Sequence, residues 1–348
     1  MPQFNTDNHT SFASDIIAVA DEEGRALVVP ILKATYKIRE RGGLELLDKE
    51  EQLKVDPEGK HVGEPGLSSM IYEPETAFIK LATDVVLVGT AVAPRAGATE
   101  SEVLFRVGEL RKTIKIVGNR TWQRTLLSTS ISKPQPFENI PLIWENAFGG
   151  WDRSLENPDR HTFEPRNPIG TGFRSKRGTF EDGIRLPNLE NPQHPLKHHG
   201  DAPPPAGFGF VGPHWQPRAA LGGTYDDTWT KSRAPLLPKN FDRRFFNAAP
   251  PDQILQRPPL GGEPVLVTNT TASGTVAFDL PRISSPVCRF VLRQGEDVEV
   301  TMPLDTLIVN TDDMLLVMLW RCHIALRRGP HDLTALEISA EQTELVTR

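Results

Sequence analysis

The amino-acid sequence predicts a mainly β protein with few short helices. Its N- and C-terminal parts are expected to form antiparallel sandwich or barrel-like sheets. Three observations predict this fold class. The 348 residues include 31 prolines and 27 glycines, which disfavour long helices because an interior proline removes a helix hydrogen bond. Both ends of the chain contain many short β-branched and apolar segments between polar turns. The middle mixes prolines with aromatic residues, which predicts an ordered loop layer.

Strand signals begin near the N-terminus. Asp21–Gly24 separates two apolar segments and predicts a hairpin turn. Asp84–Val92 is β-branched and mostly apolar, which is typical of a buried strand. Ile114 and Ile116 alternate with polar neighbours, the period of a half-buried strand. The strands predicted here are Ile16–Ala20, Ala26–Tyr36, Asp84–Val92, Val103–Val107, Thr113–Val117 and Trp122–Thr129.

The C-terminal third repeats this pattern of short segments and polar turns. In Thr275–Leu280, apolar Val276, Phe278 and Leu280 alternate with less apolar neighbours. The tail, Thr334–Arg348, contains charged helix formers and predicts a short helix or a frayed end. The strands predicted here are Val265–Thr268, Thr275–Leu280, Cys288–Leu292, Val298–Met302, Thr306–Val309, Met314–Trp320 and His323–Leu326.

The middle of the chain differs from both flanks. Eighteen of the 31 prolines lie between Pro158 and Pro264, interleaved with aromatic residues that can anchor loops on sheets. The helices predicted in the middle are Ile140–Ala147 and Asp226–Arg233. We therefore expect a β-rich part at 1–130, a loop-rich region at 131–263 packed on the sheets, and a β-rich part at 264–348. Together these would form one domain with two sub-domains.

Composition excludes several classes of protein. The net charge of −6 and the lack of a basic block argue against binding of nucleic acid. The polar first ten residues do not resemble a secretion signal. The longest apolar run, Met314–Trp320, is far shorter than the roughly 20 residues that cross a bilayer. Only Cys288 and Cys322 are present, so we expect no disulfide framework, buried thiols and a cytoplasmic protein.

No catalytic or metal-binding motif is convincing, and we expect neither an enzyme nor a cofactor. The spacing G-x-G-x-x-G occurs at 207–212, but flanking prolines leave no strand before it and no helix after it. Four histidines are close in sequence, but prolines prevent a helix that would hold two of them on one metal. Adjacent acids are more typical of turns than of catalysis. These residues are His194, His198, His199 and His214, and Glu181 with Asp182, Asp226 with Asp227, and Asp312 with Asp313.

Two glycine clusters predict fixed turns. The segment 145–151 couples the end of the predicted helix to a double glycine, where a left-handed conformation would end the helix. The segment 167–173 combines a rigid proline turn with two permissive glycines and an aromatic anchor. The alternative is a shaped loop that presents its backbone to a partner. The residues concerned are Glu145, Asn146, Phe148, Gly149, Gly150, Asn167, Pro168, Gly170, Gly172 and Phe173.

These clusters belong to a longer series of motifs by which the chain resembles the DUF2169 family of bacterial proteins. The resemblance covers roughly residues 15–325. Its other motifs lie mostly in the proline-rich middle and are LPN at 186–188, PAGFG, PHWQPR, GTYDDTW, PLLP and FDRRFFNAAPPDQ between 205 and 253, GGE at 261–263, and the segments 304–309 and 319–321.

The resemblance implies an accessory protein of a bacterial type VI secretion system. Members look like cytoplasmic adaptors or chaperones that help to load a toxic effector, often one with a PAAR tip, onto the VgrG spike. The effector, a PAAR protein and VgrG are therefore the expected partners. The resemblance implies no catalytic residues.

The sequence leaves two alternatives open. One is a carbohydrate-active hydrolase or lyase that uses Asp226 or Asp227, and the other is a structural component of the spike. For an adaptor, aromatic and arginine residues of the middle motifs are the candidate partner contacts, because such residues are enriched at interfaces. Exposed strand edges could also accept a strand from a client. The candidate contact residues are Trp215, Arg218, Tyr225, Trp229, Arg243, Arg244 and Phe246.

Overall fold

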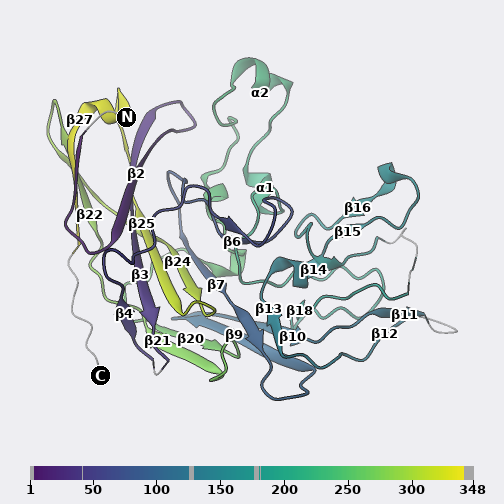
Figure 1. Ribbon diagram of the computed structural model, residues 1–348. Coiled ribbons are helices and arrows are strands. Elements are labelled where there is room, and N and C mark those ends of the chain that lie inside the picture. Colours follow the sequence, from purple (N-terminus) through teal and green to yellow (C-terminus); the bar gives the residue numbers. More distant parts are fainter. Residues whose placement is uncertain (1–3, 41, 125–128, 176–179, 181, 341–348) are drawn as a thin grey trace.

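The protein is mainly β, as the sequence predicts (Figure 1). The computed structural model describes residues 4–40, 42–124, 129–175, 180 and 182–340. Helices in these residues are confined to α1 (Arg218–Leu221), α2 (Asp227–Ser232) and short 3-10 turns. None of the described helices is long and apolar enough to cross a membrane.

The largest sheet joins strands from both ends of the chain. Its long strand β3 is almost completely buried because side chains cover both of its faces. β7 and β24 run parallel, while β24, β25, β3 and β2 are antiparallel in turn, so the sheet is mixed. In order, the strands are β19 (Ile254–Leu255), β7 (Thr83–Val88), β24 (Leu304–Asn310), β25 (Leu315–Arg321), β3 (Ala26–Ile38) and β2 (Ala13–Ala20), with β4 (Leu44–Leu46) and β26 (Ile324–Ala325) also pairing with β3.

Two further sheets pack around this one. The five-stranded sheet has the order β18 (Leu189–Glu190), β10 (Leu110–Val117), β9 (Glu100–Val107), β20 (Pro264–Thr268) and β21 (Thr275–Asp279). The four-stranded sheet has the order β1 (Asn5–Asn8), β27 (Leu333–Ser339), β22 (Val287–Leu292) and β23 (Val298–Thr301). The pairs β3–β25, β7–β24 and β9–β20 each join the first predicted part of the chain to the last.

The remaining described strands form two-stranded pairs outside the three larger sheets. These are β5 (Lys60–His61) with β6 (Met70–Tyr72), β8 (Thr90–Val92) with β13 (Asn139–Pro141), β11 (Trp122–Arg124) with β12 (Thr129–Ile131), β14 (Phe148–Gly149) with β17 (Thr171–Gly172), and β15 (Trp151–Asp152) with β16 (Thr162–Phe163). The segment that carries α2 and the β15–β16 hairpin both project from the body of the molecule (Figure 1).

The core is divided by the largest sheet. One face, including Val28 and Leu32, joins the main hydrophobic cluster with residues of the other two sheets. The opposite face, including Val29 and Ile31, packs beneath the loops that contain Phe78 and Phe210. Side chains along β3 point alternately to the two faces of the sheet, so they pack into two different cores. Both cysteines are free and buried, as expected.

Most predicted strands are confirmed, with ends shifted by one to three residues, and the helix predicted at Asp226–Arg233 is α2, which Asp226 caps. Trp122–Thr129 is described only at its ends, because residues 125–128 lie outside the described part. Asp84–Val92 splits into β7 and β8.

Two expectations are wrong. Ile140–Ala147 is not an α-helix: Asn139–Pro141 pairs with β8, and only Trp144–Asn146 forms a 3-10 turn. Pairing with a distant strand outweighs the local helix signal there. In the tail, Leu333–Ser339 is a strand because β22 and β1 pair with it on both sides. Residues 341–348 lie outside the described part.

Candidate functional site

A cavity of about 540 Å³ opens between the loop that joins β5 to β6 and the segment that carries α1. Its lining residues come from the stretches 61–77, 212–218 and 245–246. The volume falls within the range of about 300–1,000 Å³ that is typical of ligand-binding cavities. The first stretch belongs to the N-terminal part and the others to the proline-rich middle, so only the folded chain forms this site.

Apolar side chains form much of the cavity wall. Trp215 is buried, and its ring meets that of Trp144 edge to face with centroids 5.8 Å apart. Phe245 and Phe246 line the cavity from the third stretch. A Cβ atom at Gly212 would lie 2.8 Å from the Trp215 ring, so only glycine fits there. This close packing holds the wall in place before any ligand arrives.

The G-x-G-x-x-G spacing at 207–212 serves the same packing. Phe208 and Phe210 are fully buried, and the carbonyl of Phe210 accepts a hydrogen bond of 2.8 Å from Trp144 Nε1. A Cβ atom at Gly207 would lie 2.7 Å from the Trp144 ring. The glycines therefore allow the close approach of two tryptophans to this segment.

Arg218, the first residue of α1, lines the cavity with a guanidinium that the backbone holds in place. Its Nε donates to the carbonyl of Phe245 at 2.8 Å and its Nη1 to that of Val211 at 2.7 Å. The guanidinium also lies over the Phe245 ring, 5.0 Å from its centroid. Its Nη2 donates to none of the described residues. Burial lowers the pKa of Arg218, and the carboxylates of Glu73 and Asp84 act against that shift.

Glu73 lines the same cavity and is 7% exposed. Its Oε1 accepts a hydrogen bond from Lys80 Nζ, whereas its Oε2 accepts none from any described residue. Burial raises the pKa of Glu73, because the charge of Lys80 only partly replaces the lost contact with water. A carboxylate oxygen of a cavity-lining residue that has no partner among the described residues is a binding position for a further hydrogen-bond donor.

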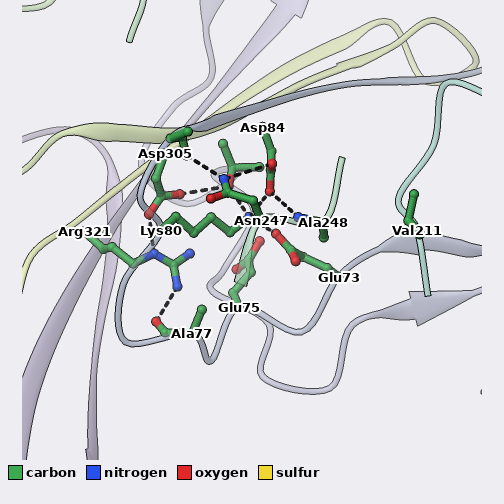
Figure 2. A network of polar contacts seen from close by, with 12 residues as sticks. Glu73, Glu75, Ala77, Lys80, Asp84, Val211, Asn247, Ala248, Asp305 and Arg321 are labelled. Atoms are coloured by element: carbon green, nitrogen blue, oxygen red, sulfur yellow. Dashed lines mark hydrogen bonds and ion pairs between the residues drawn. The ribbon is translucent and has the colours of Figure 1, made fainter. Parts of the chain in front are cut away.

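Lys80 is the centre of a buried charged network beneath the cavity (Figure 2). Besides Glu73, its Nζ contacts Asp84 Oδ2 at 2.7 Å and Thr306 Oγ1 at 2.8 Å. Burial alone would lower the pKa of Lys80, but the carboxylates of Asp84 and Glu73 outweigh it and raise that pKa. Asp84 also accepts a hydrogen bond of 2.8 Å from the backbone N–H of Ala248. Burying a lysine is tolerable here because all three of its donors have partners.

Two further ion pairs lie beside this network, and Figure 2 shows the one between Arg321 and Asp305. Arg321 pairs with Asp305 and also donates to the carbonyl of Ala77, which lines the cavity. Lys33 pairs with Glu75 at 2.6 Å. The network thus connects the cavity lining to strands β3, β7, β24 and β25 of the largest sheet.

Five of the seven predicted contact residues fall into two places. Trp215, Arg218 and Phe246 line the cavity. Tyr225 and Trp229 meet edge to face, with centroids 4.7 Å apart, on the projecting segment, where Tyr225 is 57% exposed.

Arg243 and Arg244 make ion pairs outside the cavity lining. Arg243 pairs with Glu22 at 2.5 Å, and Arg244 is exposed and pairs with Asp242. Among the charged residues of this site, sequence analysis missed Glu73 in the lining and Lys80 beneath it. Their only signal is the presence of three charged residues, Glu73, Glu75 and Lys80, within the mostly apolar segment 70–80.

The two glycine motifs lie side by side and form a single turn structure. β14 pairs in parallel with β17, which brings Phe148 opposite Thr171. Asn167 ties the turns together, since its Nδ2 donates to the carbonyls of Trp144 at 2.8 Å and Phe148 at 3.0 Å. Phe173 anchors the second turn against Phe148, with ring centroids 6.3 Å apart.

Close backbone contact explains the glycines of this structure. Gly150 has φ +91°, and a Cβ atom there would lie 2.2 Å from the carbonyl oxygen of Gly170. At Gly149 the nearest atom would be the carbonyl oxygen of Asn167 at 2.1 Å, and at Gly172 Pro187 Cδ at 2.8 Å. Pro168 follows Asn167 in the same turn.

Glu145 and Asn146 connect this turn structure to neighbouring segments. Glu145 Oε1 accepts a hydrogen bond of 2.8 Å from the backbone N–H of Ser69. Asn146 Oδ1 accepts one of 2.9 Å from Arg185 Nη2, which also donates to Asn188 Oδ1 at 2.7 Å. All ten motif residues therefore lie in one packed structure.

The histidines considered in the sequence lie in loops. His194 and His198 are exposed, and His199 packs edge to face on Trp122, with centroids 5.8 Å apart. His214 lines the cavity and accepts a hydrogen bond of 3.2 Å from Trp215 Nε1.

The adjacent acids make local hydrogen bonds. Asp226 caps α2 through the N–H of Trp229 at 2.8 Å, and Asp227 lies in its first turn. Asp312 accepts from Thr90 Oγ1 at 3.1 Å, and Asp313 from Asn310 Nδ2 at 2.9 Å. Asp182 accepts from the backbone N–H of Arg124, and Glu181 lies outside the described residues.

Fold and cavity together define a mainly β protein with a preformed, largely apolar cavity. Among the described residues, Glu73 is the one carboxylate in the lining of this cavity. The family described as "Uncharacterized protein conserved in bacteria (DUF2169)" matches residues 23–321. The chain therefore belongs to this family. Comparisons with curated proteins and with solved structures found no match.

Proposed function

We propose that this protein is a type VI secretion adaptor or chaperone of the bacterial cytoplasm. It binds a toxic effector, often one that carries a PAAR tip, and helps to load it onto the VgrG spike. The observation that carries the proposal is the cavity. Motifs by which the chain resembles such accessory proteins supply Trp215, Arg218, Phe245 and Phe246 to its wall. A wall of aromatic and arginine side chains is typical of protein interfaces.

The positions of the acids favour binding over hydrolysis. Asp226 and Asp227 belong to the exposed start of α2, and neither lines the cavity. A glycosidase needs two carboxylates across one cleft, whereas Glu73 is the one described carboxylate in the lining. We therefore keep the adaptor as the proposed function and assign no catalytic residue.

Co-purification tests the proposal directly. The tagged protein would be isolated from its native bacterium, with and without the gene of a neighbouring effector, and bound proteins identified by mass spectrometry. We expect the effector or a PAAR protein, together with VgrG, only when the effector gene is present. A preparation that contains no effector or spike component would overturn the proposal.

Fractionation separates an adaptor from a structural component of the spike. Cells and culture medium would be probed for the tagged protein while type VI secretion is active. An adaptor stays in the cells while VgrG reaches the medium. Recovery of the protein with secreted VgrG would support the structural alternative instead.

A further inference from the structure

We infer that the cavity binds an extended peptide segment of the client protein. One apolar side chain of that segment enters the cavity, and a flanking backbone amide pairs with Glu73 and Arg218. This inference rests on the proposed function for the identity of the client, but the peptide chemistry follows from the cavity itself.

The first argument is charge balance. The described side chains in and beneath the cavity lining carry no excess charge, because cations and carboxylates match in number. A cavity balanced in this way, with aromatic walls, favours an uncharged apolar group over an ion. The matched groups are Lys33, Lys80, Arg218 and Arg321 on one side and Glu73, Glu75, Asp84 and Asp305 on the other.

The second argument is the pair of unused hydrogen-bonding groups. Glu73 Oε2 can accept a hydrogen bond and Arg218 Nη2 can donate one, and neither has a partner among the described residues. The two residues line one cavity without forming an ion pair with each other. A ligand group with both a donor and an acceptor would give each of these two atoms a hydrogen-bond partner. The peptide amide is the commonest such group in proteins.

The third argument is the loop that borders the cavity. Leu67 and Val62, on the loop between β5 and β6, are 68% and 48% exposed. Pro65, Gly66 and Ser68 of the same loop line the cavity. A small molecule inside the cavity would leave these apolar side chains in water. A continuous chain that enters the cavity extends over the neighbouring loop as well, which favours a peptide.

Selection from a library of random linear peptides, displayed on phage, tests the inference with the complete protein. We expect selected peptides to share an apolar residue and to bind as synthetic peptides. Thr76 is exposed and lines the cavity, so Thr76→Trp obstructs the cavity and should weaken binding about tenfold or more. Thr301→Trp, at an exposed position of β23 outside the lining, is the matched control and should leave the affinity unchanged.

Backbone recognition is tested by a double-mutant cycle. N-methylation of the amide beside the apolar residue removes the donor to Glu73 and should weaken binding to the wild type about tenfold. The same methylation should weaken binding to the Glu73→Gln variant much less, provided that circular dichroism shows that this variant is folded. Equal losses in both proteins would overturn the assignment of Glu73.

Failure of the inference is distinguishable from failure of the proposed function. If no peptide is selected, or if Thr76→Trp binds selected peptides as the wild type does, the inference is wrong. If Thr76→Trp still co-purifies with effector and VgrG, the adaptor function stands while the cavity is excluded as its site. If peptides bind in the cavity but wild type recovers no secretion component, the proposed function fails and the peptide site remains.

Discussion

The charged network at Lys80 and the paired turns at Gly150 stabilise neighbouring regions by opposite means. Beneath the cavity, charged side chains are buried and neutralise one another. In the paired turns, amide groups bond to backbone carbonyls, and the close approach depends on missing side chains. Each region leaves one side-chain oxygen without a partner among the described residues: Asn167 Oδ1 is buried in the turns, and Glu73 Oε2 belongs to a residue that lines the cavity. Family motifs run through both regions, so a motif alone does not distinguish scaffold from binding surface.

Removal of the positive charge of Lys80 should have the largest effect on stability. Lys80→Met leaves Glu73 and Asp84 buried without their common partner, which should lower the free energy of unfolding by about 3–5 kcal/mol. Urea denaturation followed by circular dichroism measures this loss. Lys231→Met, at an exposed position of α2, is the control and should change stability by less than about 0.5 kcal/mol. A Lys80→Met protein as stable as this control would show that the network does not support the fold.

A side chain at Gly150 in the paired turns should lower the free energy of unfolding somewhat less than the loss of the Lys80 charge. Gly150→Ala combines an unfavourable φ of +91° with a Cβ atom 2.2 Å from a carbonyl oxygen, and should destabilise by about 3 kcal/mol. Gly274→Ala has a similar φ of +78° but no atom within 4 Å, and should lose only about 1 kcal/mol. Equal losses in the same denaturation assay would mean that backbone conformation, and not contact, determines the glycine at 150.

The smallest expected effects are those of pH on stability. As the pH falls, the contributions of Asp152 and Glu73 to the free energy of unfolding should change in opposite directions. At Asp152 of the β15–β16 hairpin, burial would raise the pKa, but hydrogen bonds from Ser154 and Ser175 lower it from 3.8 to about 2. Its contribution to stability is therefore present above pH 3.8 and is lost as the pH falls toward 2. Glu73 has a raised pKa, so its effect on stability is the opposite. Its contribution to stability is present below pH 4.5 and is lost as the pH rises through its folded-state pKa.

Matched variants isolate these two carboxylates. Between neutral pH and pH 4.5, the wild type should gain stability relative to Glu73→Gln, while its difference from Asp152→Asn stays constant. Below pH 3.8 the wild type should lose stability relative to Asp152→Asn. Urea denaturation at each pH measures both differences. A wild type that loses stability relative to Glu73→Gln between pH 7 and 4.5 would contradict the raised pKa of Glu73.

The local sequence determined most of the longer strands, the hairpin turn at Asp21–Gly24 and the short helix α2. Alternation, β-branching and capping act between residues close in sequence, so each can be recognised without the rest of the chain. Where a distant strand competes, as β8 does at Asn139–Pro141, local preference is overridden. The helix predicted there failed for this reason.

The sequence also supplied three residues of the cavity wall, Trp215, Arg218 and Phe246, because their types are typical of interfaces. Only the tertiary structure decided that a cavity exists, that Glu73 lines it and that Lys80 lies beneath it. Lys80 meets Thr306, which lies 226 residues away along the chain. The environment of a buried charge depends on such distant neighbours, and no periodicity within a segment records them.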